Sequence, residues 1–260
     1  MTRVMAAHQP NFLPYLGFFD KLKRVDEMGT GHGIFVIRDD CQYVHRDFHN
    51  RNRIRTNTGD GWMWLYVPVE HEMIPIREVR IRHDKKIAGR ESWTKYHLRM
   101  IWDNYRRTPF FDKYYQGFVE IYSNPGDSLC DFNMRLIQYI AHCFAIKTRI
   151  ISFYDLSLPM NGVEASETLA AIARAVGADV YLSGDGGKGY LEMAPFNGSV
   201  RVEFQNYEHP IYPQRYPGFK PYMSAIDALF NTGRIALSGE QITSSGERAG
   251  SILNAPSDFK

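Results

Sequence analysis

Three polar side chains that can hold or move protons follow directly after the first apolar run of the chain. The run is Val4 to Ala7, and His8, Gln9 and Asn11 come next, with Pro10 restricting the backbone between them. A free imidazole has a pKa near ~6.5, so it exchanges protons at neutral pH. We predict that His8 is a general acid or base, and that Gln9 and Asn11 orient a substrate carboxylate, phosphate or sugar hydroxyl. The alternative is a loop histidine that bonds only to backbone.

A pair of carboxylates follows the second apolar run. Ile34 to Ile37 is typical of a short strand, and Asp39 and Asp40 come after it. We predict that one of them is the base, the partner of His8, or a ligand of a divalent cation bound together with a nucleotide. Paired acidic residues are also common caps of turns and helices. Cys41 borders the pair, but a thiol nucleophile needs an activating base, so interior packing is its expected role.

The segment from His45 to Arg55 is the densest run of basic residues. In a strand, Arg51, Arg53 and Arg55 share one face, and guanidinium groups bind phosphate or carboxylate through two parallel hydrogen bonds. This face is therefore predicted to hold a pyrophosphate or an anionic sugar. The alternative is a solvated edge strand whose charges prevent aggregation. His45 and His49 are four residues apart, but with neither a helix nor a third ligand they do not predict a zinc site.

A glycine-rich turn follows the apolar stretch 179–183. It reads Ser183-Gly184-Asp185-Gly186-Gly187-Lys188-Gly189. Glycine N–H groups can approach an anion closely, and Lys188 adds a positive charge. We predict a phosphate-binding turn that uses Ser183, Gly184 and Lys188, although the spacing is not that of a P-loop. Ser183 lacks the GxSxG surroundings of a nucleophile, so covalent catalysis is not expected.

Prolines stiffen the segment after the last predicted strand. The segment reads His209-Pro210-Ile211-Tyr212-Pro213-Gln214. We predict that His209 and Gln214 reach a substrate, while rigidity alone also explains the prolines.

Strands and helices alternate along the chain in a way that would position these groups. Apolar strands are predicted at 4–7, 34–37, 149–153, 179–183 and 200–204, and helices at 15–25, 166–176 and 224–230. Continuous apolar strands joined by helices indicate βαβ units with parallel strands, and ligands bind at the carboxyl ends of such strands. The stretches 62–69 and 76–81 are predicted to be β-rich. Asp20 and Lys21 are expected on a helix surface or as anchors of the first loop.

A helical block interrupts this alternation. Helices are predicted from Trp93 to Asn104, from Phe110 to Tyr122, and from Ser128 onward, where Asp131 completes a capping box. The predicted fold class is α/β, a Rossmann-like, largely parallel sheet flanked by helices, with a helical insertion at about 90–147. We expect one domain over 1–240 and a polar, flexible tail over 241–260.

The composition excludes several classes of protein. The 260 residues are 44% hydrophobic and 23% charged, without an apolar run long enough for a transmembrane helix or a signal peptide. Three cysteines in no CxxC pair favour a reducing, cytoplasmic location. A net charge of +2 gives no basis for general binding of nucleic acid or membranes. Aromatic residues make up 14%, and tyrosines beside Asn, Gln and Arg favour a ligand cleft with flat walls.

Six motifs follow one another from about His8 to Gly233. They are His8-Gln9-Pro10-Asn11-Phe12-Leu13-Pro14-Tyr15-Leu16-Gly17 with Phe19-Asp20-Lys21; Asp39-Asp40 with Gln42-Tyr43; Asn50-Arg51-Asn52-Arg53-Ile54; Tyr181-Leu182-Ser183-Gly184 with Lys188 and Tyr190-Leu191; His209-Pro210; and Tyr212-Pro213-Gln214. In these motifs the chain resembles the WbqC-like proteins. It departs from their pattern at Glu27 to Gly33, where the turn is longer, and at Asp185-Gly186.

The resemblance implies a small-molecule enzyme that attaches an aminoacyl or other acyl group to an amino sugar or nucleotide-linked acceptor, in surface-polysaccharide or natural-product biosynthesis. A weaker likeness concerns the HxGH nucleotidyltransferases, whose motif corresponds to Tyr15-Leu16-Gly17-Phe18 with aromatic rings in place of both histidines. A nucleotidyltransferase and a non-catalytic sugar- or nucleotide-binding module are therefore the alternatives. For a DNA-modifying reaction the net charge is unfavourable.

We therefore expect a transferase whose catalytic residues are His8, Asp39 and Asp40. The predicted substrate-binding residues are Gln9, Asn11, Tyr15, Gln42, Tyr43, Asn50, Arg51, Asn52, Arg53, Ser183, Gly184, Lys188, His209 and Gln214. The expected substrate is a small molecule carrying phosphate, carboxylate or sugar, and the candidate cofactors are a nucleotide and Mg²⁺. This prediction requires that the His8 loop and the glycine-rich turn converge at one edge of the sheet.

Overall fold

A five-stranded parallel sheet forms the centre of the computed structural model, which describes residues 2–70, 73–87, 91–158, 164–196, 198–243 and 248–249. The strands are β1 (Val4–His8), β2 (Ile34–Ile37), β7 (Arg149–Ser152), β8 (Val180–Ser183) and β9 (Arg201–Phe204), in the spatial order β7-β2-β1-β8-β9. Numbered within the sheet, this is the order 3-2-1-4-5 of a doubly wound Rossmann fold. The predicted α/β class is confirmed.

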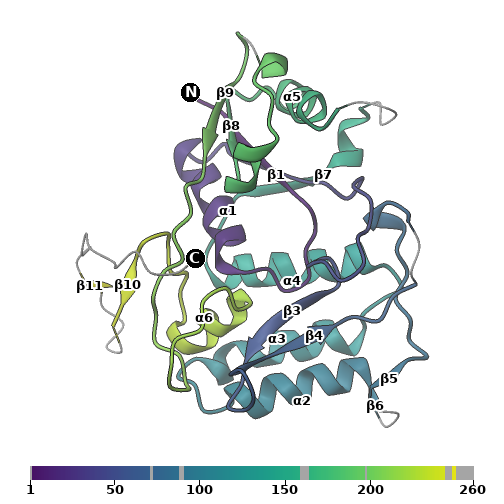
Figure 1. Ribbon diagram of the computed structural model, residues 1–260, viewed down its shortest axis with the longest axis vertical. Coiled ribbons are helices and arrows are strands. Elements are labelled where there is room, and N and C mark those ends of the chain that lie inside the picture. The colour runs from purple at the N-terminus through teal and green to yellow at the C-terminus, as the bar shows by residue number, and fades with distance from the viewer. Residues whose placement is uncertain are drawn as a thin grey trace.

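The three inner strands, β1, β2 and β8, bury both of their faces. Ala6 and Phe35 belong to a core shared with helix α1 (Leu16–Met28), whereas Met5 and Val36 belong to a second core with helix α5 (Ala165–Ala175). Because both faces are covered, these three strands are largely apolar runs without alternation, as the sequence indicated. Figure 1 shows the sheet and α5 in the upper half of the molecule, with α1 beside the strands.

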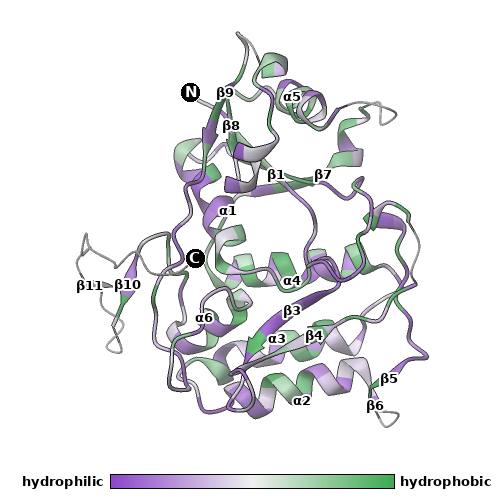
Figure 2. Ribbon diagram, in the orientation of Figure 1, coloured by the Kyte–Doolittle hydropathy of each residue, from purple (hydrophilic) through white to green (hydrophobic). Residues whose placement is uncertain are grey.

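The helical block and a β-hairpin form the lower half of the molecule in Figure 1. The helices are α2 (Trp93–Tyr105), α3 (Phe111–Ser123) and α4 (Leu129–Cys143), and the hairpin pairs β3 (Arg51–Arg55) with β4 (Trp62–Tyr66). All three helices fall inside the interval predicted for the insertion, and Ser128 caps α4 by accepting a hydrogen bond from the Asp131 N–H. The helices carry alternating apolar and polar bands in Figure 2, which is typical of helices that pack through one face.

The predicted β-rich stretch at 76–81 is wrong for its first part. Ile76–Glu78 is a 3₁₀ helix that begins after Pro75, and the Val79 N–H donates to the Ile76 carbonyl at 3.2 Å. Ile76 and Val79 are both fully buried. A spacing of three residues puts both side chains on one side of a helical turn, whereas a strand would point them to opposite faces.

The remaining elements are short, and the first of them is a helix that is buried in the core at seven of its eight residues. They are α6 (Ala225–Thr232), β5 (Lys86–Ile87), β6 (Glu91–Ser92), β10 (Gln241–Ile242), β11 (Arg248–Ala249) and 3₁₀ helices at Phe153–Leu156, Asp185–Gly189 and Ala194–Phe196. Of the tail predicted over 241–260, all but 241–243 and 248–249 lies outside the described residues. Among the helices of the described part, none has the length and apolar character needed to cross a membrane.

Candidate functional site

A cleft of about 580 Å³ opens at the carboxyl edge of the sheet. Its walls come from the ends of β1 and β8, the start of α1, the segment after β2 and the start of α5. The strand order reverses between β1 and β8, because β2 and β7 lie on one side of β1 and β9 lies beyond β8. Doubly wound sheets bind their ligands at this switch point.

Five of the predicted site residues line this cleft: His8, Gln9, Tyr15, Ser183 and Gly184. Strands β1 and β8 are hydrogen-bonded neighbours, with Met5 opposite Tyr181. The loop after β1 and the turn after β8 therefore meet at one edge of the sheet, as expected.

His8 has a defined tautomer in the cleft. Its Nδ1 lies 3.0 Å from the Gln9 carbonyl oxygen, which can only accept, so Nδ1 carries the proton and Nε2 holds the lone pair. No described residue forms a hydrogen bond with Nε2. Burial, and secondly the positive charge of Lys21, lower the pKa of His8 to about 3. The imidazole is therefore neutral at physiological pH and presents an acceptor nitrogen.

Lys21 supplies a cation that the sequence analysis misplaced. We expected it on a helix surface or as a loop anchor, but it is 4% exposed and lines the cleft. Its Nζ donates to the Ala7 carbonyl at 3.3 Å, and no described carboxylate forms an ion pair with it. Burial lowers the pKa of Lys21 to about 8, although Asp185 opposes the shift. An ammonium group with three donors thus enters the cleft with one long hydrogen bond.

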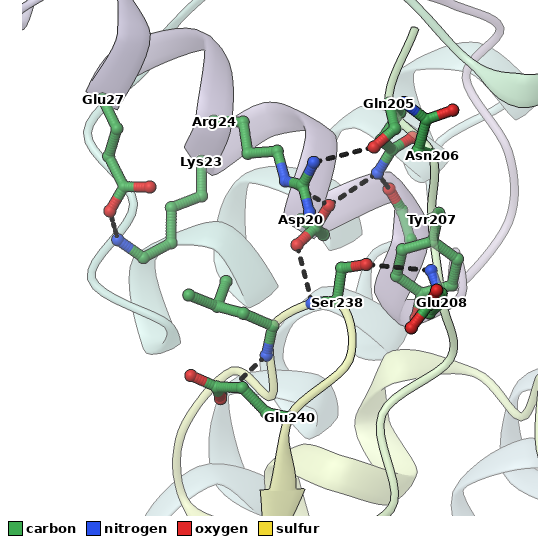
Figure 3. A network of polar contacts seen from close by, with 12 residues as sticks. Asp20, Lys23, Arg24, Glu27, Gln205, Asn206, Tyr207, Glu208, Ser238 and Glu240 are labelled. Carbon is green, nitrogen blue, oxygen red and sulfur yellow. Dashed lines mark hydrogen bonds and ion pairs between the residues drawn. The ribbon is translucent and has the colours of Figure 1, made fainter. Parts of the chain in front are cut away.

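A buried carboxylate holds α1 in the orientation that points Lys21 at the cleft. Asp20 is fully buried and accepts from Gln205 Nε2 at 2.8 Å, Arg24 Nε at 2.9 Å and the Ser238 N–H at 3.0 Å (Figure 3). The N–H of Gln205 donates to the Ser183 carbonyl at 2.8 Å. The network therefore ties α1 to the end of β8, where the glycine-rich turn begins. This is also a correction, since Asp20 was expected on the surface.

The glycine-rich turn is compact because one of its glycines admits a close contact. A Cβ on Gly187 would lie 2.1 Å from Ser183 Oγ, and that hydroxyl, in a residue 1% exposed, donates to the Gly184 carbonyl. Asp185 accepts from Lys188 Nζ at 2.8 Å and from the Tyr207 N–H at 2.7 Å. Burial acts to raise the pKa of Asp185, but these bonds outweigh it and hold the pKa below its usual value.

Lys188, predicted as a phosphate clamp, does not line the cleft. Its ammonium group is bonded to Asp185 and, at 2.6 Å, to Asn206 Oδ1, and its side chain is 49% exposed. In this structure the positive charge nearest the turn and facing the cleft is that of Lys21, whose Nζ lies 3.5 Å from the place where a Cβ on Gly184 would be.

Asp39 and Asp40, predicted as catalytic residues, do not line the cleft either. Asp40 accepts two hydrogen bonds from Arg38, both at 2.7 Å, and Arg38 lines the cleft. Asp39 accepts from Ser152 Oγ at 2.7 Å, and burial raises the pKa of Asp39. Cys41 lines the cleft, and burial raises the pKa of its thiol, so it is protonated at neutral pH. Within the described residues, His, Cys, Asp and Glu side chains nowhere gather in threes suited to a metal ion.

Flat aromatic rings form much of the remaining wall. The Tyr15 ring meets the Tyr207 ring edge-on, with centroids 5.7 Å apart, and the Tyr207 hydroxyl is buried without a partner among the described residues. Such walls suit the rings of a sugar or a base. The tyrosines that line the cleft are Tyr15, Tyr181, Tyr190, Tyr207 and Tyr222.

Two predicted contact residues instead use their polar groups within the protein. His209 donates from Nδ1 to the Pro210 carbonyl at 2.8 Å and accepts the Tyr222 N–H on Nε2 at 2.9 Å, so it positions a tyrosine of the cleft. Gln214 donates to Asp227 Oδ2 at 2.7 Å and accepts the Lys220 N–H. Neither residue lines the cleft.

The remaining predicted residues belong to the loops and hairpin beside the cleft, not to its lining. Asn52 donates to the Leu13 carbonyl at 2.7 Å and so supports a residue whose φ is +41°. Asn50 donates to the Val67 carbonyl at 2.9 Å, and Gln42 is exposed. Among these residues, Asn11, Tyr43 and Asn50 each have a buried side-chain oxygen without a partner in the described structure. Arg51 and Arg53 lie on β3.

Sequence reasoning missed the two cations of the cleft, Lys21 and Arg38. Arg38 directly follows β2, at the same sheet edge as His8, so its position after a predicted strand was an available signal. Lys21 lies four residues after Gly17, which also lines the cleft, and residues four apart share a helix face.

Comparison with known proteins agrees with the motifs. The model of the WbqC-like protein family matches residues 9–238. A curated protein of Mycobacterium tuberculosis, described as "Uncharacterized protein Rv1507c", is 32% identical over 232 residues, which cover 88% of this chain and 94% of the relative. No solved structure matches the chain. The family match begins at Gln9, directly after His8, and includes the hairpin, the glycine-rich turn and the segment around His209. The chain therefore belongs to the WbqC-like protein family.

Proposed function

We propose that the protein is a transferase that passes an acyl or aminoacyl group to the amine of an amino sugar or of a nucleotide-linked acceptor, in surface-polysaccharide or natural-product biosynthesis. The observation that carries the proposal is the composition of the cleft. A neutral histidine with a free acceptor nitrogen, an under-bonded ammonium group and a glycine turn lie around one volume of about 580 Å³.

These groups suit the transfer of an acyl group that carries a phosphate leaving group. The acceptor amine attacks the carbonyl carbon while Nε2 of His8 takes the proton that the amine loses. The bond between the carbonyl carbon and the phosphate oxygen breaks, and the phosphate keeps the electron pair. Lys21 and the backbone of Gly184 to Gly187 stabilise the negative charge that this oxygen gains.

The charges of the cleft make His8 a better base once an anion is bound. Lys21 contributes to the low pKa of the empty site, after burial itself. A phosphate beside Lys21 offsets that repulsion, so the pKa of His8 rises, which makes its Nε2 a stronger base, while burial still holds the pKa below its ordinary value.

The order of the sheet strands also favours a second candidate, nucleotidyl transfer. Sheets of the order 3-2-1-4-5 bind nucleotides at the crevice where this cleft lies. Such an enzyme would release pyrophosphate from ATP, whereas an acyl transferase would leave the nucleotide of its acceptor intact. Incubation with ATP labelled in the α-phosphate, with and without Mg²⁺, separates the two, because only nucleotidyl transfer moves the label onto the acceptor.

The test begins with a thermal-shift screen over amino acids, nucleotides and sugar nucleotides, since a ligand raises the melting temperature by mass action. Compounds that bind are then incubated with acyl phosphates, and products are identified by mass. We expect His8→Ala to reduce turnover about 100-fold or more, and Lys21→Met to reduce it similarly. Lys23→Met, on the outer face of the same helix, is the control. Full activity in both cleft variants would contradict the proposal.

A further inference from the structure

One face of the β3–β4 hairpin alternates arginines with aromatic rings. In the antiparallel register Arg51 lies opposite Tyr66, Arg53 opposite Trp64 and Arg55 opposite Trp62, and directly paired residues share a face. The Arg51 guanidinium carbon is 4.2 Å from the centre of the Trp64 ring, and that of Arg53 is 5.2 Å from the Trp62 ring. The rings thus support the guanidinium planes and leave their N–H edges available.

The three arginines of this face differ sharply in their partners. Arg55 is 2% exposed and donates to Gln214 Oε1 and to the carbonyls of Thr56, Gly61 and residues 216–218. Its donors are satisfied by the protein, so its role is structural. Arg51 and Arg53 form no ion pair with a described carboxylate, and the Nε of each is buried without an acceptor in the described part of the chain.

The shortage of acceptors extends to the residues that precede the strand. Val44 N–H donates to His49 Nδ1 at 3.2 Å, so the proton of the neutral ring is on Nε2. That nitrogen is buried and has no acceptor among the described residues, and His49 is fully buried. The Tyr43 hydroxyl, in a residue 3% exposed, is likewise without a partner in the described structure, and its ring lies 5.8 Å from that of His49. Because His49 and Tyr43 are buried, their unmet groups lie inside the protein, and only Arg51 and Arg53, which are partly exposed, can reach an external ligand.

A hydrogen bond connects this face with the wall of the cleft. Arg53 donates to the carbonyl of Tyr222 at 3.2 Å, and Tyr222 lines the cleft. Burial lowers the pKa of Arg53, as expected for a guanidinium without a carboxylate beside it. A ligand bound at Arg53 would therefore lie next to a residue of the cleft wall.

We propose that Arg51 and Arg53 bind the diphosphate group of a nucleotide-linked ligand whose reacting end lies in the cleft. Two guanidinium groups, two residues apart on one strand face, offer two planar forks, and a diphosphate has two adjacent phosphoryl groups to receive them. Only the chemistry of the reacting end depends on the proposed function. It makes the acceptor an organic diphosphate, such as a nucleoside diphosphate sugar.

Calorimetric titration with uridine diphosphate, uridine monophosphate and pyrophosphate tests this subsite without any turnover. We expect Arg51→Gln and Arg53→Gln each to weaken uridine diphosphate binding at least tenfold, with a much smaller effect on the monophosphate. Arg106→Gln is the matched control, because Arg106 stacks on exposed Trp102 at 4.0 Å at the end of α2, outside the hairpin and the cleft lining. Circular dichroism and thermal melting confirm that each variant is folded, and Arg51→Lys, which keeps the charge without the fork, should recover only part of the affinity.

The outcomes separate this inference from the proposed function. If the diphosphate binds equally to both hairpin variants and weakens only in Lys21→Met, it binds in the cleft and the subsite is refuted. A wild-type protein that binds neither uridine diphosphate nor pyrophosphate at millimolar concentration refutes it as well. If the hairpin variants lose the diphosphate but no acyl donor is consumed, the subsite is supported and the proposed transferase reaction is not.

Discussion

Replacing Lys21 by methionine should stabilise the protein in the absence of phosphate and reduce the stabilisation that phosphate gives. A fall in the lysine pKa from 10.5 to about 8 on folding corresponds to roughly 3 kcal/mol of destabilisation, at about 1.4 kcal/mol per pKa unit. Methionine fills a similar volume without the charge. Loss of the hydrogen bond to the Ala7 carbonyl offsets part of the gain. We therefore expect Lys21→Met to be more stable by about 1–3 kcal/mol at pH 7, or several degrees in melting temperature.

The pH dependence of this difference identifies its cause. The unfolded lysine keeps its proton up to about pH 10.5, whereas the folded one keeps it only up to about pH 8. The cost of Lys21 is therefore complete below pH 8 and disappears as the pH rises toward 10.5. The advantage of the variant over wild type should shrink across that window.

Inorganic phosphate should remove most of this difference in stability or reverse it. A ligand at 100 times its dissociation constant stabilises the folded state by about 2.7 kcal/mol, and the variant lacks the cation that binds it. Differential scanning calorimetry with and without phosphate measures both effects, and Lys23→Met, whose side chain pairs with Glu27 at the surface, controls for a lost positive charge. A Lys21→Met protein that is less stable than wild type at pH 7, and equally stabilised by phosphate, would refute this reasoning.

Three further predictions follow from contacts of single residues. His97 is fully buried, donates to the Tyr66 carbonyl and has a pKa lowered by burial to about 3. Its contribution to the free energy of unfolding is therefore complete above pH 6.5 and is lost as the pH falls toward 3, by up to ~5 kcal/mol. Urea unfolding at pH 7 and pH 4.5 should show a smaller loss for His97→Gln than for wild type, and identical losses would exclude His97 as the source. Gly187→Ala brings a Cβ within 2.1 Å of Ser183 Oγ, whereas a Cβ on Gly186 meets nothing within 4 Å. We expect Gly187→Ala to destabilise the protein by roughly 1–3 kcal/mol and to weaken phosphate binding in a titration. Similar behaviour of Gly186→Ala would contradict this. Asp20→Asn should destabilise the protein by on the order of 3 kcal/mol. This is near the lower end for a broken buried ion pair, because the Arg24 side chain is 32% exposed. A change below about 0.5 kcal/mol in chemical unfolding would show that the network contributes little.

The elements of the sheet could be predicted because their signals are local. The run Ile34 to Ile37 is a strand with those bounds, and the stripe of Leu16, Phe19, Leu22 and Val25 is buried as a helix stripe should be. Once parallel strands were expected, the rule for ligands at their carboxyl ends placed the loop of His8 in the cleft.

The polar face of α1 could not be predicted from its own sequence. The periodicity of a helix identifies only its apolar stripe, so Asp20 and Lys21 were predicted on the helix surface or as anchors of the first loop. Asp20 is buried because Gln205 and Ser238, 185 and 218 residues away in the chain, bring polar groups to that face, and Lys21 because its ammonium group meets the end of β1 at Ala7. Similarly, no local signal distinguishes Arg55 from Arg51, which lies four residues earlier on the same strand face. The difference comes from residues 216–218, whose carbonyls accept hydrogen bonds from Arg55.

The position of β1 in the sheet has a consequence for how the chain reaches its folded state. The first strand of the sheet to be synthesised is its central one, and one of its two neighbours, β8, begins about 175 residues later. At typical ribosomal rates, β1 waits roughly 10–35 s for that neighbour. During this time an apolar strand edge has open N–H and C=O groups, which favours pairing with other nascent chains. Yield in the cell should therefore depend on chaperones that cover the amino-terminal half until β8 emerges.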